Sequence, residues 1–193
     1  MAIALDANML ILLFDERAPA PIDPTTGQPV TYCQERIRHF LDVFSRPKGA
    51  RIIIPTPALG EFLVKVDPAQ AGEYISQIQR IRGCHLAPFS VRACIEFADV
   101  QRAVLNDRRQ KRRQDVETRA KAKFDQQIVA IAKSEGVTSI YSDDEGLGKF
   151  AARFSLTRIG VAELTLPPKS MQGVLHLEPP EPDRTPEDPD GLE

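Results

Sequence analysis

Short apolar runs alternate with longer amphipathic stretches along the first 166 residues of this chain. The apolar runs, several of them rich in β-branched residues, predict buried strands at residues 3–5, 51–54, 84–89, 138–141 and 157–161. The amphipathic stretches repeat apolar residues every three or four positions, and they predict helices at residues 8–14, 33–44, 57–66, 68–82, 91–104, 124–134 and 147–154. Because strands and helices alternate, the pattern predicts an α/β fold with a mainly parallel sheet.

Two segments lack either pattern. Residues 15–31 are rich in Pro, Asp, Thr and Gly, which predicts a long loop. The second segment, residues 167–193, holds seven of the sixteen prolines and seven acids against two Lys or Arg. Such a composition cannot bury a core, so we expect one domain over residues 1–166 followed by a disordered, Pro-rich acidic tail.

The bulk composition is that of an ordinary globular protein, with 42% hydrophobic and 27% charged residues and a net charge of −2. No apolar run is long enough to span a membrane, and the N-terminus meets an acid at residue 6, unlike a signal peptide. The cysteines, Cys33, Cys84 and Cys94, are odd in number and lack zinc-site spacing. We therefore expect a cytoplasmic protein in which the three thiols are small, buried apolar groups.

Acidic residues follow or flank several of the predicted strands. Asp6 ends the first strand, Glu61 lies in the helix after the second, and Asp125 opens a later helix. Asp143 and Asp144 follow the strand at 138–141. Ligand sites of open parallel sheets gather beyond the carboxyl ends of the strands, so these acids can converge. Singly, each except Asp6 also fits an ordinary role as a turn acid, a helix-dipole partner or a solvated charge.

Convergent carboxylates indicate a particular chemistry. They repel one another and stay ionised only beside a cation or another compensating group. Oxygen ligands without Cys or His favour Mg²⁺ or Mn²⁺ over zinc. An acid-held divalent ion suits phosphodiester hydrolysis, because it can generate hydroxide and stabilise the leaving oxygen.

The order of these motifs resembles that of a known family. A strand is followed by Asp6 and Asn8, Glu61 lies in the helix TPALGEFL, Asp125 stands in FDQQIVAIA, and Ser142 in IYSDD. Over residues 2–164 this arrangement looks like a PIN domain, and in particular like the VapC-like toxins of bacterial toxin–antitoxin pairs. The chain is longer than a compact VapC-like toxin, so a PIN nuclease of another lineage is the alternative.

The resemblance implies a three-layer, Rossmann-like α/β/α sandwich and a Mg²⁺- or Mn²⁺-dependent ribonuclease. It implies metal-coordinating and catalytic roles for Asp6, Glu61, Asp125 and Asp144, with Asp143 as the competitor of Asp144 for the fourth position. It also implies that Asn8 or Ser142 forms a hydrogen bond with a ligand carboxylate or with the scissile phosphate.

The stretch 102–123 is strongly basic, with nine Lys or Arg residues against three acids, and it runs directly into Asp125. We predict a basic helix that attracts the phosphates of RNA. The candidate substrate-binding residues are Arg109, Arg112, Arg113, Lys121 and Lys123. The alternative is a solvated helix of mixed charge, which is the more common role of a charge run.

The function predicted from these features is that of an endoribonuclease acting on single-stranded or structured RNA. The resemblance adds a role as the toxin of a toxin–antitoxin pair, an antitoxin partner, and a homodimer. A second hypothesis is a PIN-like module that binds RNA or protein without cleaving it. A third, a phosphatase of the DxD type, would need an acid where Asn8 stands.

Overall fold

The computed structural model describes residues 1–110 and 116–168, and for residues 104–110 and 116–121 it describes the backbone only. Arg112, Arg113 and the acidic tail from residue 169 onward lie outside the described residues. The side chains of Arg109 and Lys121 also lie outside them. Predictions for these residues stay predictions.

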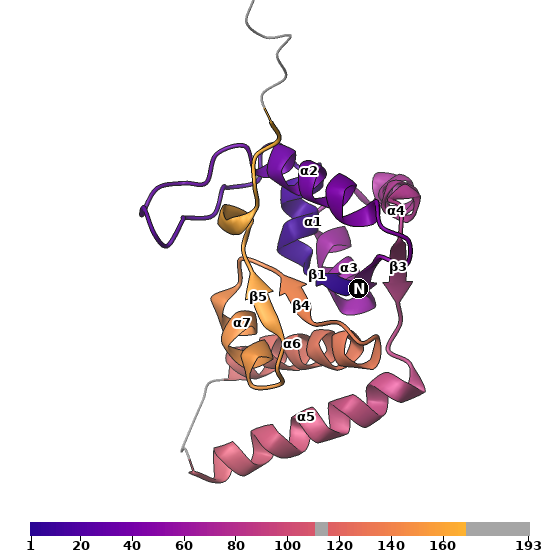
Figure 1. Ribbon diagram of the computed structural model, residues 1–193. Helices are drawn as coiled ribbons and strands as arrows, with labels where there is room; N and C mark the ends of the chain where they lie inside the picture. The colour runs from indigo at the N-terminus through magenta and orange to yellow at the C-terminus, as the bar shows by residue number, and fades with distance from the viewer. Residues whose placement is uncertain (111–115, 169–193) are drawn as a thin grey trace, which may run out of the picture.

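A single five-stranded sheet forms the centre of the domain (Figure 1). Its strands are β1 (Ala2–Leu5), β2 (Arg51–Pro55), β3 (Cys84–Ala87), β4 (Ser139–Tyr141) and β5 (Thr157–Ile159). They lie in the order β3-β2-β1-β4-β5, and every neighbouring pair is parallel. Each strand coincides with a predicted apolar run, so the parallel α/β prediction is confirmed.

The helices also follow the predicted pattern, with different ends. They are α1 (Ala7–Phe14), α2 (Cys33–Ser45), α3 (Thr56–Val64), α4 (Ala71–Arg80), α5 (Val91–Gln110), α6 (Val116–Ser134) and α7 (Glu145–Ala152), with single 3-10 turns η1 (Pro68–Gln70) and η2 (Val161–Glu163). Helices α5 and α6 extend beyond the predicted ranges because the added residues are good helix formers without apolar periodicity. In the described part of the chain no helix is long and apolar enough to cross a membrane.

Apolar side chains alternate between the two faces of the sheet, as expected for strands buried on both sides. In β1, Ala2 and Ala4 join one core cluster with α5, α6 and α7. Ile3 and Leu5 join the other cluster with α1, α2 and α4. The domain is therefore the three-layer α/β/α sandwich that the sequence predicts, with PIN-like architecture.

Helix α5 packs against α6 on the side that faces away from the sheet (Figure 1). An ion pair of 2.9 Å between Lys133 Nζ and Glu96 Oε2 joins the two helices. The basic stretch 102–123 is thus divided between α5 and α6, so the prediction of one continuous basic helix is wrong. Helices α5 and α6 instead pack against each other, and both ends of the stretch are helical.

The loop 15–31 is long, as predicted, but it contains its own structure. An isolated antiparallel bridge pairs Ile22 with Pro29. At its tip, Asp23 Oδ1 accepts a hydrogen bond of 2.8 Å from the Thr25 amide, which is a common turn-forming contact.

The cysteines differ from their expected burial. Cys33 and Cys84 are partly buried, whereas Cys94 is exposed. Cys94 lies on the outer side of α5, because Ala93 and Val100 occupy the side that packs inward.

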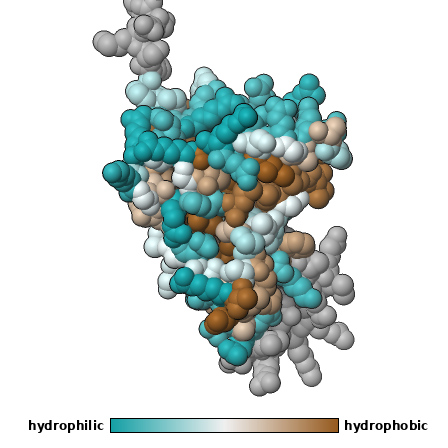
Figure 2. Space-filling model, turned by 90° about the vertical axis from the view of Figure 1, so that its right-hand side faces the viewer, coloured by the Kyte–Doolittle hydropathy of each residue, from teal (hydrophilic) through white to brown (hydrophobic). Residues whose placement is uncertain are grey.

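Apolar side chains are also exposed on α5, among them Val91 and Ile95. Figure 2 shows apolar surface on the side of the molecule that carries β3 and the start of α5.

Candidate active site

The strand order places the ends of β1 and β4 side by side. From β1 the chain builds β2 and β3 on one side, and it later adds β4 and β5 on the other. The crevice at such a switch point, beyond the carboxyl ends of the strands, is the usual ligand site of an open parallel sheet. Asp6 follows β1 and Ser142 follows β4, so both lie at this switch point.

Asp6 is a buried carboxylate, with 6% of the residue exposed. Its backbone amide donates a hydrogen bond of 3.1 Å to the Tyr141 carbonyl, which continues the pairing of β1 with β4. One carboxylate oxygen, Oδ2, accepts a hydrogen bond of 2.8 Å from the Ser142 hydroxyl. The position of Asp6 therefore follows from the register of two adjacent strands.

Ser142 connects the polar groups of the site. Its hydroxyl donates to Asp6 and accepts from Asn8 Nδ2 at 3.2 Å and from the Asp144 amide at 3.0 Å. A hydroxyl has one donor and two acceptor positions, so all of them are used. Ser142 is fully buried, and it joins the start of α1 to the turn between β4 and α7.

Burial and neighbouring charges both change the pKa of Asp6. Burial, which disfavours the charged form, raises the pKa of Asp6 from 3.8 to about 6. The Ser142 hydrogen bond lowers the pKa, while the charges of Glu61 and Asp144 raise it further. Glu61 is an exposed side chain on α3. Glu61 and Asp144 are thus near enough for their charges to act on Asp6.

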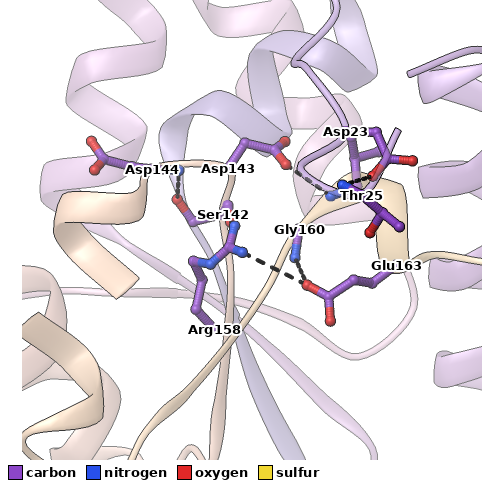
Figure 3. A network of polar contacts seen from close by, with 9 residues as sticks. Asp23, Thr25, Ser142, Asp143, Asp144, Arg158, Gly160 and Glu163 are labelled. Carbon is purple, nitrogen blue, oxygen red and sulfur yellow. Dashed lines mark hydrogen bonds and ion pairs between the residues drawn. The ribbon is translucent and has the colours of Figure 1, made fainter. Parts of the chain in front are cut away.

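Asp143 and Asp144 point to opposite sides of the chain (Figure 3). Asp144 is the N-cap of α7, where its Oδ1 accepts a hydrogen bond of 3.0 Å from the Leu147 amide. The Oδ1 of Asp143 instead accepts one of 3.0 Å from the Val161 amide at η2. Burial raises the pKa of Asp143. Because Asp143 is engaged at η2 and the charge of Asp144 acts on Asp6, these contacts favour Asp144 as the fourth acid.

Asp125 does not open a helix, because α6 begins at Val116. It is half-buried and lies nine residues before the end of α6 at Ser134. Its predicted role as a metal ligand stays a prediction.

Of the predicted phosphate-binding residues, only Lys123 has a described side chain, and it is exposed on α6 two residues before Asp125. Arg109 lies in α5 and Lys121 in α6. The structure therefore places at least one exposed cation on the helix that carries Asp125.

The oxygen atoms of the candidate acids and of Asn8 suit a hard divalent cation, although these side chains do not form a complete metal site. Among the described residues, no three His, Cys, Asp or Glu side chains are grouped as a metal site. The Oδ1 atom of Asn8 is, however, buried without a hydrogen-bond partner in the described structure. A buried oxygen of this kind, beside a desolvated carboxylate, is stabilised by a positive charge.

Arg158 also contacts the site, although the sequence did not indicate it. Its Nη1 donates a hydrogen bond of 3.0 Å to the Ser142 carbonyl, so it contacts the turn that holds the site (Figure 3). No local pattern marks Arg158, since it lies 16 residues from Ser142 and meets it only because β5 pairs with β4.

The all-parallel sheet and the helices on its two faces give the chain a PIN-like α/β/α fold. No family model matches the sequence, and no curated protein matches it. Among solved structures, the chain is similar to one chain of VapBC2 from Rickettsia felis, bound to a DNA fragment from its promoter, and to one of VapBC-1 from nontypeable Haemophilus influenzae. In both comparisons the TM-score is 0.52 and the identity 13%, over 83% of this chain and 98% of the other.

Sequence identity of 13% shows a shared fold and no more. The similarity confirms, for the fold, the resemblance to VapC-like PIN domains that the sequence motifs indicate.

Proposed function

We propose that this protein is a metal-dependent endoribonuclease. The proposal depends mainly on one observation, the buried Asp6 at the β1–β4 switch point, which is held by Ser142 and whose pKa is raised further by the charges of Glu61 and Asp144. A carboxylate that is costly to keep ionised, with further carboxylates beside it, is typical of a cation-binding catalytic site. The similarity in fold to VapBC proteins supports the same function.

In this proposal Asp6, Glu61, Asp144 and Asp125 hold Mg²⁺ or Mn²⁺, which supplies Lewis-acid stabilisation and an activated water. Ser142 keeps Asp6 oriented toward the ion and lowers its pKa. Lys123 and the basic residues of α5 and α6 attract the phosphate backbone of RNA through charge. The chain therefore supplies orientation and attraction, and the reaction is hydrolysis of a phosphodiester bond.

The decisive experiment is cleavage of a labelled single-stranded RNA with Mg²⁺ or Mn²⁺. Asp6→Asn and Asp125→Asn are expected to lower the rate at least 100-fold, because loss of a group that only orients a metal ligand already costs about 10- to 100-fold. Glu145→Gln is the control, because Glu145 is exposed on α7 and pairs with Lys149. Equal cleavage by the wild type and Asp6→Asn would exclude this site.

The biological role that we propose is that of a toxin paired with an antitoxin protein, as the names of the VapBC structures suggest for those proteins. Induced expression of the wild type should arrest bacterial growth, while Asp6→Asn should not. Coexpression of the cognate antitoxin should restore growth. Arrest by both forms would separate toxicity from the nuclease site.

One observation favours a second function, that of an RNA- or protein-binding module without nuclease activity. The acids of the described chain are not grouped as a finished metal site. Under this alternative the wild type binds RNA but cleaves none in either metal, and Asp6→Asn binds RNA equally well.

A further inference from the structure

The backbone of Ser142 is held by β5 and the turn that follows it. The Ser142 amide donates a hydrogen bond of 2.9 Å to the Ile159 carbonyl, and the Ser142 carbonyl accepts one of 3.0 Å from Arg158 Nη1. Arg158 Nη2 lies 3.9 Å from Glu163 Oε1, which itself accepts a hydrogen bond of 2.8 Å from the Gly160 amide (Figure 3). Every polar atom of Ser142 is therefore engaged.

Arg158 is directed at this backbone and away from the solvent. Only 26% of its side chain is exposed. Its guanidinium meets a carbonyl and a carboxylate, which leaves it poorly placed to bind a phosphate. The cation thus acts inside the protein, on the residue that orients Asp6.

Two glycines provide the space for this arrangement. A Cβ atom on Gly148 of α7 would lie 2.4 Å from Arg158 Cδ and 3.1 Å from Arg158 Cβ. A Cβ atom on Gly160 would lie 2.8 Å from Asp143 Oδ1 and 3.1 Å from Arg158 Nη1. Any side chain at Gly148 would therefore displace the stem of Arg158 from its path across α7.

We propose that Arg158, lying in the space left by Gly148 and Gly160, is a positioning residue that sets the orientation of the Ser142 hydroxyl and through it the Asp6 carboxylate. This inference rests on the proposed nuclease function. Without Arg158, the Ser142 carbonyl loses its charged donor and the turn between β4 and α7 loses its connection to Glu163. The Ser142 hydroxyl then holds Asp6 less firmly, so the site binds its metal ion more weakly.

The test measures Mn²⁺ binding by electron paramagnetic resonance, alongside RNA cleavage. Arg158→Ala is expected to weaken Mn²⁺ affinity about tenfold, the lower end for residues that orient ligands, and to keep most of the cleavage rate at saturating Mn²⁺. Arg158→Lys, which retains one charged donor, should restore affinity to within about threefold of the wild type. Lys149→Ala is the control, because it removes an equal charge from the surface of α7.

A double-mutant cycle tests the path of the side chain. Gly148→Ala alone should weaken Mn²⁺ binding about as much as Arg158→Ala, whereas the same change in the Arg158→Ala background should add nothing. Additive effects would show that Gly148 acts independently of Arg158, and they would overturn the proposal. Thermal unfolding of each variant identifies a loss of affinity that merely follows a loss of folded protein.

Amide hydrogen exchange at Asp144 gives a readout that needs no metal. This amide donates to the Ser142 hydroxyl, so Arg158→Ala should speed its exchange while amides of α2 are unchanged. Unchanged exchange, or faster exchange with unaltered Mn²⁺ affinity, would overturn the positioning role. If the wild type neither binds Mn²⁺ nor cleaves RNA, the proposed function fails, and exchange at Asp144 alone decides whether Arg158 holds Ser142.

Discussion

Asp6 is the residue whose chemistry is most changed by the fold. A carboxylate on an exposed strand end would be ionised at neutral pH without cost. Here burial raises its pKa to about 6, and Glu61 and Asp144 add to the rise. Keeping Asp6 ionised near pH 7 therefore costs the folded state free energy, which a bound cation would recover.

Asp6→Asn should remove the free-energy cost of keeping Asp6 ionised in the folded state, and the resulting gain in stability should depend on pH. The folded form binds the proton of Asp6 more tightly than the unfolded chain, so its stabilising contribution is present below about pH 4 and lost as pH rises through about 6. The rise of the Asp6 pKa from 3.8 to about 6 corresponds to about 3 kcal/mol in the free energy of unfolding. In metal-free urea unfolding, the variant should gain up to that much relative to the wild type between pH 4 and pH 8. A constant difference across this range would contradict the raised pKa.

Ser142→Ala should destabilise the fold more than the loss of an ordinary serine hydroxyl. It leaves one buried and two partly buried polar partners without their contact, and we expect a cost of about 2–3 kcal/mol in urea unfolding. Ser134→Ala is the matched control, because Ser134 is also buried but its hydroxyl only donates to the Ile131 carbonyl in its own helix. Similar costs for the two variants would argue against a network around Ser142.

Among the secondary-structure elements, α7 links folding to the site, because its N-cap is one of the candidate metal ligands. Asp144→Asn should separate the two roles, since Asn caps a helix about as well as Asp but carries no charge. The variant should unfold within about 0.5 kcal/mol of the wild type and yet lose RNA cleavage. Asp144→Ala should lose cleavage and also about 1 kcal/mol of stability. A stable and active Asp144→Asn variant would return the fourth position to Asp143.

The strands could be predicted more precisely than the helices. The central strands β1, β2 and β4 are short, largely buried apolar runs, so their limits coincide with a change in composition, whereas the edge strands β3 and β5 are only partly buried. A helix shows periodicity only where it packs on a core. The first residues of α6, and with them the position of Asp125 along that helix, could therefore not be inferred from periodicity.

Across the whole molecule, the two edges of the sheet differ in charge. At the amino edge, Arg51 and Glu135 form an ion pair of 3.0 Å between β2 and the residue after α6. At the carboxyl edge, the charges of Glu61 and Asp144 act on Asp6, and a cation from outside the chain would balance them. The asymmetry follows from the parallel topology, which gathers all the strand ends of one kind at one edge.

The acidic tail should affect RNA binding through charge alone. Residues 167–193 carry seven acids, and they compete with RNA for the basic stretch 102–123. A chain ending at Leu166 should therefore bind RNA several-fold more tightly at about 50 mM salt, with the difference vanishing at about 0.5 M. A full-length chain with the seven acids neutralised is the control for length. Unchanged affinity in both would remove the tail from RNA binding.

The sequence by itself determined the strands, the parallel α/β class and the acids that follow them, because burial of a strand and the polar end of that strand are local properties. Tertiary structure decided which acids meet. It brings the charge of Asp144 within range of Asp6 and directs Asp143 toward η2, although the two are adjacent in sequence. It also brings Arg158 to Ser142, because only the pairing of β4 with β5 makes those residues neighbours.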